Sequence, residues 1–151
     1  MRNEGMGMRA LHLLLRPGLA VGLFLAQFTS TRPSLFTDSL YALALGAILT
    51  AAGVALWVAA SWQLQRANDE GNIATRSPFR YIRHPIYVSI YVLSIGMGFL
   101  FFAWAWFAVL AAFVPLWWLE AKSEEREMRE RYGKAYTAYM ERTAMFIPGL
   151  W

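Results

Sequence analysis

Two long uncharged stretches constrain what this chain can fold into. Residues 40–64 contain no charged side chain in 25 positions, and residues 86–119 contain none in 34. A helix needs about 20 apolar residues to cross the roughly 30 Å hydrocarbon core of a bilayer, so each stretch is long enough for a crossing. Charged residues make up 16% of the 151 positions, against about 25% in soluble domains. The chain is therefore predicted to be an integral membrane protein.

The second stretch is too long for a single span. As one helix it would extend about 51 Å at 1.5 Å per residue. We therefore expect a hairpin of two spans, 86–101 and 103–119, and the glycines and tryptophans near its middle indicate a turn between about residues 99 and 105. Pro115 is expected to kink or loosen the returning helix.

The first apolar segment, residues 11–29, is predicted to be a further, rather short span. A cleaved signal peptide would have a similar basic start, but Arg16-Pro17 interrupts the apolar run and no A-x-A cleavage site follows. Whether this segment crosses the bilayer fully is left open. The sequence thus predicts about four transmembrane helices, at 11–29, 40–64, 86–101 and 103–119.

A charged, helix-forming segment follows the last span. It covers residues 120–142 and is broken at Gly133. Met128, Tyr132, Tyr136 and Tyr139 recur on one face of a helix, a pattern more typical of packing than of a binding site. We expect a helix docked on the cytosolic membrane surface. The predicted fold is all-α: a single domain, residues 1–151, forming a polytopic membrane helix bundle with a C-terminal cytosolic or interfacial helix.

The basic residues predict the topology. With four spans, those of the N-terminus, of the connector 65–85 and of the tail lie on one side, and the other side receives only Arg32, balanced by Asp38. The positive-inside rule makes both termini cytoplasmic, and we expect the plasma (inner) membrane of a prokaryote. The net charge of +4 therefore indicates membrane lipids and not nucleic acid as partners. The sequence leaves the oligomeric state open.

The residues that several kinds of catalytic or metal site require are absent from the sequence. The chain has no cysteine, no Gly-rich phosphate loop and no HExxH motif, and a Ser/His/Asp triad has no local support. Its two histidines, His12 and His84, are far apart in sequence, so no metal site is expected.

The connector before the third span concentrates polar and aromatic side chains where the membrane should begin. Arg80 and Arg83 could bind a carboxylate or phosphate, and the aromatic residues could stack on a base or face a cation. These are Phe79, Tyr81 and Tyr87. Glu120 and Glu124 are four residues apart, so they share a helix face, and a carboxylate there could accept hydroxyl groups such as those of a ribose. Each residue alone fits a topology anchor or a solvated charge, but the whole set favours a site.

Two motifs resemble those of a known family. Residues 72–87, NIATRSPFRYIRHPIY, resemble the connector of the isoprenylcysteine carboxyl methyltransferase / phospholipid methyltransferase superfamily. The tail resembles its second motif, with Glu124-Glu125, Met128, Tyr132-Gly133, Tyr136 and Tyr139 followed by Ile147-Pro148. The resemblance covers roughly the C-terminal half of the chain. It implies an S-adenosylmethionine-dependent membrane methyltransferase without a Rossmann domain, acting on a lipophilic acceptor at the cytosolic face.

By position, the resemblance also implies a cofactor site in the segments 71–87 and 120–148. Its residues would be Gly71, Asn72, Ile73, Ala74, Phe79, His84, Pro85, Ile86, Tyr87 and Glu124, with Glu125 as a neighbour. We add Tyr81 to the cofactor candidates because its ring could stack on the adenine. Arg83 and Glu120 are the catalytic candidates.

The acceptor is less defined, because the sequence departs from the superfamily pattern. Ser77 and Ser89 replace glycines common in the motif, and Glu120 stands where prenylcysteine methyltransferases carry an arginine thought to meet the substrate carboxylate. A glutamate would repel a carboxylate, and it would suit a protonated amine or act as the base that deprotonates it. Arg126 or Arg142 could compensate.

Three functions are therefore kept in view. The first is methyl transfer like that of the isoprenylcysteine carboxyl methyltransferases, and the second is N-methylation of a phospholipid or other amine. The third is a non-enzymatic membrane scaffold or subunit.

Overall fold

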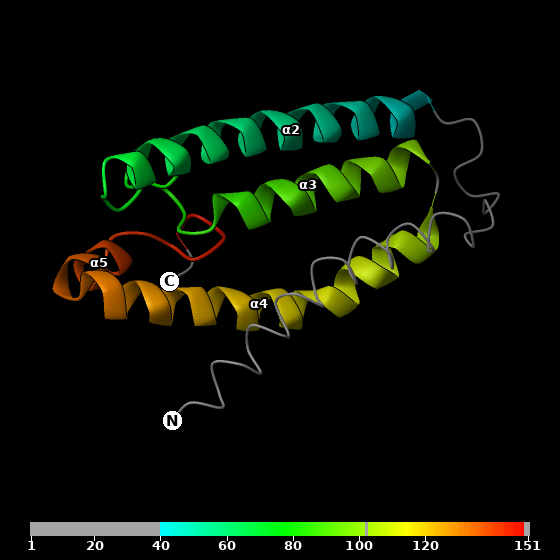
Figure 1. Ribbon diagram of the computed structural model, residues 1–151. Coiled ribbons are helices and arrows are strands. Elements are labelled where there is room, and N and C mark those ends of the chain that lie inside the picture. Colours follow the sequence, from blue (N-terminus) through cyan, green and yellow to red (C-terminus); the bar gives the residue numbers. More distant parts are fainter. Residues whose placement is uncertain (1–39, 102, 150–151) are drawn as a thin grey trace.

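The computed structural model describes residues 40–101 and 103–149, which form four helices (Figure 1). They are α2 (Leu40–Asp69), α3 (Pro85–Leu100), α4 (Trp104–Tyr132) and α5 (Lys134–Met140). Within these residues the regular structure is helical, which confirms the all-α class. The predicted span 11–29 lies outside the described residues.

Helices α2 and α3 lie side by side, and α4 returns along them (Figure 1). The turn predicted within residues 99–105 is present: α3 ends at Leu100, α4 begins at Trp104, and the backbone N–H of Ala103 donates to the Gly98 carbonyl across it. Two described helical segments, Leu40–Asp69 and Ala105–Tyr132, are long and apolar enough to cross a membrane. Helix α3 is apolar but has 16 residues, about 24 Å of helix, so two of the four predicted spans meet this test among the described residues.

The charged segment differs from the prediction. Residues 120–132 do not form a separate surface helix but continue α4 without interruption. They are rich in Glu and Arg, which are strong helix formers, and no glycine or proline separates them from the apolar part. The helix ends where predicted, at Gly133, whose φ of 54° is a left-handed value that favours glycine. Of the predicted charged segment 120–142, only the part after Gly133 forms a helix of its own, α5.

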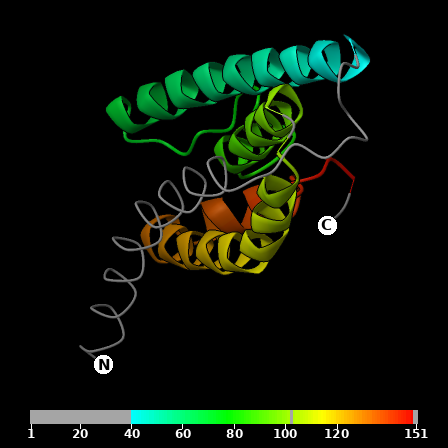
Figure 2. The same cartoon turned by 90° about the vertical axis from the view of Figure 1, so that its right-hand side faces the viewer.

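Pro115 lies inside α4. Figures 1 and 2 show that α4 changes direction along its length. A proline within a helix removes one backbone hydrogen bond and crowds the preceding turn, so a bend is the expected consequence.

Glycines allow α2 and α3 to approach closely. A Cβ atom on Gly53 would lie 2.5 Å from the backbone nitrogen of Leu93, and one on Gly96 would lie 2.5 Å from that of Thr50. Small residues are the usual means of close helix packing in membranes, where hydrophobic burial does not drive helices together. Helix α3 meets α4 less extensively, near the turn, where Trp106 Nε1 donates to the Ser94 carbonyl.

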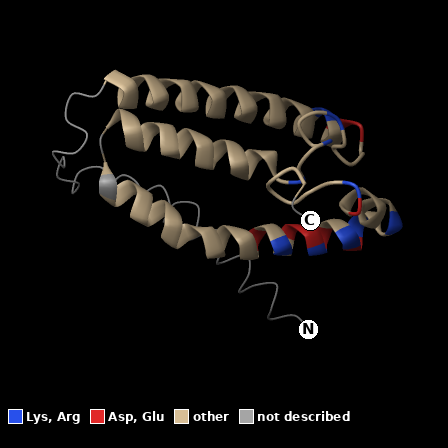
Figure 3. Cartoon of the chain, turned by 180° about the vertical axis from the view of Figure 1, so that it is seen from behind, with Lys and Arg blue, Asp and Glu red and all other residues tan. Residues whose placement is uncertain are grey.

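Two segments without regular helix meet at the charged end of the bundle: the connector between α2 and α3, residues 70–84, and the tail after α5, residues 141–149. Ile82 and Ala144 form a parallel bridge, and the N–H groups of Arg83 and His84 donate to the carbonyls of Ala144 and Met145 at 2.8 and 3.2 Å. Figure 3 shows that the coloured acidic and basic residues of the described helices gather at this same end. The two segments that the sequence separates by an uncharged hairpin are therefore adjacent.

The glycine contact predicts a local loss of stability. We expect Gly53→Leu to lower the free energy of unfolding by about 1–3 kcal/mol, because the new side chain would force α2 and α3 apart. The matched control is Ala55→Leu, at an exposed position of the same helix. Thermal unfolding in detergent measures both, and an equal Tm for the two variants would contradict the packing argument.

Candidate active site

A cavity of about 670 Å³ lies at the charged end of the bundle. This volume is within the range of about 300–1,000 Å³ typical of small-molecule sites. All the described elements contribute to its wall. The lining residues are Leu64 and Asn68 from α2; Asn72, Ile73, Ala74, Phe79, Arg83 and His84 from the connector; Pro85, Ile86, Tyr87 and Ile90 from α3; Trp117, Glu120, Glu124, Glu127 and Met128 from α4; and Tyr136 and Tyr139 from α5.

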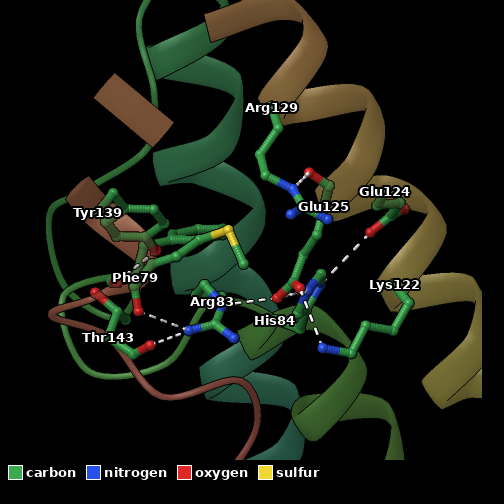
Figure 4. A network of polar contacts seen from close by, with 10 residues as sticks. Phe79, Arg83, His84, Lys122, Glu124, Glu125, Arg129, Tyr139 and Thr143 are labelled. Atoms are coloured by element: carbon green, nitrogen blue, oxygen red, sulfur yellow. Dashed lines mark hydrogen bonds and ion pairs between the residues drawn. The ribbon is translucent and has the colours of Figure 1, made fainter. Parts of the chain in front are cut away.

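A buried ion pair joins the connector to α4 beside this cavity. Arg83 Nε lies 2.7 Å from Glu125 Oε1, and the two side chains are 8% and 0% exposed (Figure 4). Arg83 Nη1 also donates to the carbonyls of Met140, at 3.0 Å, and Thr143. A charge-assisted bond of this kind is strong. One guanidinium thus fastens the connector to α4 and to the segment that follows α5.

His84 lies between two carboxylates. Its Nδ1 is 3.5 Å from Glu124 Oε2 and its Nε2 is 3.4 Å from Glu125 Oε1. The ring is buried and also contacts the rings of Tyr87 and Phe146, at centroid distances of 5.4 and 5.5 Å. Burial alone would lower the pKa of His84, but the two carboxylates outweigh burial and raise it above its usual value. The two carboxylates therefore stabilise the imidazolium form relative to that of an isolated histidine.

The partners of Glu125 keep it ionised although it is buried. It belongs to the charged extension of α4, beyond the uncharged stretch. Burial alone would raise the pKa of Glu125, but His84 and Arg83 lower it to about 2. Lys122 Nζ lies 3.8 Å from its second oxygen, Oε2. A buried carboxylate is tolerated here because three cationic groups surround it.

The cavity wall changes character along α4. Trp117 lies toward the apolar part of the helix, and its ring meets Tyr87 edge to face at a centroid distance of 5.0 Å. Glu120, Glu124 and Glu127 follow at helical spacing and all line the cavity. One end is therefore aromatic and apolar and the other end carboxylate-rich, an arrangement suited to an amphiphilic ligand.

Two tyrosines of α5 close the cavity on the tail side. The Tyr139 hydroxyl donates to the Phe79 carbonyl at 2.7 Å. Burial raises the pKa of Tyr136 to about 12 and that of Tyr139 well above its usual value. Both side chains stay neutral near pH 7 and can act as hydrogen-bond donors.

A comparison with family models identifies the group to which this site belongs. The model described as phospholipid methyltransferase matches residues 39–135, which is more than half of the chain and includes the connector and the glutamates of α4. The chain belongs to the phospholipid methyltransferase family. The predicted superfamily is thereby confirmed. No curated protein and no solved structure matches the chain.

The cavity brings together most of the residues that the sequence predicted for the site of this phospholipid methyltransferase family member. They are Asn72, Ile73, Ala74, Phe79, Arg83, His84, Pro85, Ile86, Tyr87, Glu120 and Glu124. Three others do not line it. Tyr81 is 58% exposed, Gly71 borders a neighbouring hollow after the end of α2, and Glu125 is buried behind the wall.

Other lining residues of the cavity were not singled out as site candidates in the sequence. Tyr136 and Tyr139 had the spacing of a packing stripe, Trp117 matched an interfacial aromatic, and Leu64 belonged to a span. Glu127 offered a usable signal, because it lies three residues after Glu124 and therefore on the same helix face. Among the described residues, no group of three or more His, Cys, Asp or Glu side chains could hold a metal ion.

The ion pair predicts a large stability effect. We expect Arg83→Gln to lower the free energy of unfolding by about 3–5 kcal/mol, because it leaves the Glu125 carboxylate buried without its main partner. Arg80→Gln is the matched control, since Arg80 is exposed in the same connector. Thermal unfolding at neutral pH compares them, and a small loss in Arg83→Gln would show that the pair contributes little.

Proposed function

We propose that the protein transfers a methyl group from S-adenosylmethionine to a lipophilic acceptor at the cytosolic face of the membrane. Its family makes it a membrane methyltransferase. The observation that carries the finer proposal is the cavity, whose wall runs from an apolar aromatic end to three carboxylates on α4. A cofactor from the cytosol and a lipid from the bilayer would meet in such a space.

The cavity residues fit the proposed cofactor. S-adenosylmethionine, when bound, supplies a methyl group on a sulfonium, and the acceptor's lone pair forms the new bond while the carbon–sulfur bond breaks and leaves its electron pair on sulfur. Phe79 and Tyr87 offer aromatic faces to the adenine or to the cationic sulfur. Glu124 offers a carboxylate to ribose hydroxyls, and Asn72 an amide to polar groups. These are the residues that would hold the cofactor.

The apolar residues at one end of the cavity support a lipophilic acceptor. Phe79 and Ala60 belong to one buried cluster, and Leu64 and Ile86 pack against it. Helix α3 therefore begins beside the last part of the uncharged stretch of α2. Leu64, Ile90 and Trp117 line this end of the cavity, where an acyl or prenyl chain would be favoured over water.

The protein's contribution to catalysis would be positional. Methyl transfer needs the acceptor atom aligned with the methyl carbon at about 3–3.5 Å, so a pocket that fixes both reactants supplies much of the rate. Trp117 and Tyr87 would exclude water from the reacting atoms. Arg83 would not touch the acceptor freely, because Glu125 and two carbonyls already hold its guanidinium.

An amine acceptor is the second candidate, and the charges of the wall favour it over a carboxylate. Glu120 lines the cavity together with Glu124 and Glu127, whereas Arg83 is the one arginine among the described lining residues. Arg126 and Arg142, which could have compensated, are exposed and do not line it. A carboxylate acceptor would meet like charge here. An amine would be attracted as the ammonium ion and could pass its proton to the Glu120 carboxylate before it is methylated.

Cofactor binding tests the enzymatic proposal. S-adenosylhomocysteine should bind the detergent-purified protein, and we expect His84→Ala and Glu124→Ala to weaken binding by about tenfold or more, about 1.4 kcal/mol. Glu130→Ala, at an exposed position of α4, is the control. Isothermal titration calorimetry measures all four proteins. Folded wild type that binds no cofactor would instead support the non-enzymatic scaffold.

The fate of the methyl group separates the acceptor classes. Membranes containing the protein are given S-adenosylmethionine with a labelled methyl group: base-labile label indicates an ester, and stable label on an amine lipid indicates N-methylation. Because Glu120 lines the wall, we expect Glu120→Arg to shift the preference toward carboxylate acceptors, with Glu120→Gln as the neutral control. An unchanged preference in Glu120→Arg would remove Glu120 from acceptor selection.

A further inference from the structure

Glu125 was expected at the edge of the cofactor site, but its position is different. Its side chain is fully buried, it does not line the cavity, and its Oε1 atom contacts both Arg83 Nε and His84 Nε2. The neighbouring Glu124 does line the cavity and contacts the other nitrogen of the same imidazole. Two adjacent carboxylates thus hold one histidine from two sides (Figure 4).

We propose that Glu125 is a positioning residue: from behind the cavity wall it fixes His84 as an imidazolium whose Nδ1–H is directed at Glu124. The proposal rests on the proposed function, because Glu124 matters here as a cofactor ligand. A histidine held by one carboxylate presents its other ring nitrogen in a defined direction, as the partners of metal-bound histidines also do. The side chain of Glu124 is more than a third exposed. The contact with His84 would hold its carboxylate in one orientation.

The surroundings of His84 support this assignment. Glu124 and Glu125 face it from α4, Tyr87 from α3 and Phe146 from the tail. The cations nearest to Glu125 are Arg83 and Lys122, both of which contact its carboxylate. Burial raises the pKa of Tyr136 of α5, and the negative charges of Glu125 and Glu124 raise it further. Glu124 and Glu125 are the acidic groups that raise the pKa of His84.

The direction of the pH effect follows. Because the pKa of His84 is raised in the folded protein, the contact with Glu124 is complete below the usual histidine value of about 6.5. As pH rises through the folded-state pKa, the ring loses its positive charge and one of its two N–H groups, so it can no longer donate to both carboxylates. Cofactor affinity should therefore fall on the alkaline side. Removal of the Glu125 charge should move that fall to lower pH.

Nuclear magnetic resonance can observe His84 alone. The chain has two histidines, so His12→Ala leaves a single labelled imidazole in the full-length protein. We expect His84 to titrate above pH 6.5 in this background and at a lower pH after Glu125→Gln. Glu130→Gln, the same exchange at an exposed site of α4, should leave the titration unchanged, and Glu125→Asp should restore part of the wild-type value.

The pH profile of S-adenosylhomocysteine binding distinguishes positioning from a merely structural role. We expect Glu125→Gln to shift the alkaline loss of affinity to lower pH, in step with the His84 titration. A structural role would instead weaken binding equally at every pH, which would overturn the proposal.

Two further outcomes remain decisive. A wild-type His84 that titrates at or below pH 6.5 would overturn the proposal even if Glu125→Gln did not fold. Wild type that binds no cofactor would end the proposed function, while the titration would still decide whether Glu125 holds His84.

Discussion

The contact between Arg83 and Glu125 is the interaction on which the site depends. It joins positions 42 residues apart in the chain, in the connector and in α4. Its Nη1 atom donates to the carbonyls of Met140, at the end of α5, and of Thr143 in the tail. Charges removed from water are costly unless their geometry is good and their other hydrogen-bonding atoms are satisfied. Here one guanidinium binds three segments at once, which explains why Arg83 is largely buried although the sequence alone suggests a surface anchor. Two atoms of the same network, Glu125 Oε2 and His84 Nε2, are buried without a hydrogen-bond partner among the described residues.

The cavity exists because α3 packs much more closely against α2 than against α4. Glycines let α2 and α3 pack backbone to backbone, as the position of Gly53 against Leu93 illustrates. Helix α4 changes direction along its length (Figure 2). Beyond the turn it reaches α3 through single side chains, such as Trp117 against Tyr87 and Tyr91. The space between the rigid pair and the charged half of α4 is then closed by α5 and the tail, which Arg83 and Tyr139 hold in place. Packing in the apolar half and hydrogen bonding in the polar half together make one pocket.

Part of this arrangement could be predicted from the sequence. Length and charge were enough for the hairpin, since 34 uncharged residues cannot form one span, and the motif residues identified most of the connector wall. The continuation of α4 past Leu119 was missed because a change from apolar to charged residues suggests a boundary, whereas helix formation depends on propensity and breakers. The roles of Glu124 and Glu125 could not be separated, because adjacent helical residues differ by about 100° in direction. Only the packing of α4 decides which one faces the cavity.

The same helix relates the membrane to the choice of acceptor. From Trp117 to Glu127 α4 rises about 15 Å, from the last part of the uncharged stretch to the charged end of the bundle. A lipid entering beside Trp117 would present its headgroup first to Glu120 and only then to Glu124, which lies next to His84. Since Arg83 is held by Glu125, the first charge that such a headgroup meets on α4 is negative. In the proposed function, acceptor selection would then be set one helical turn before Glu124, so a change at Glu120 could alter the acceptor without altering cofactor binding.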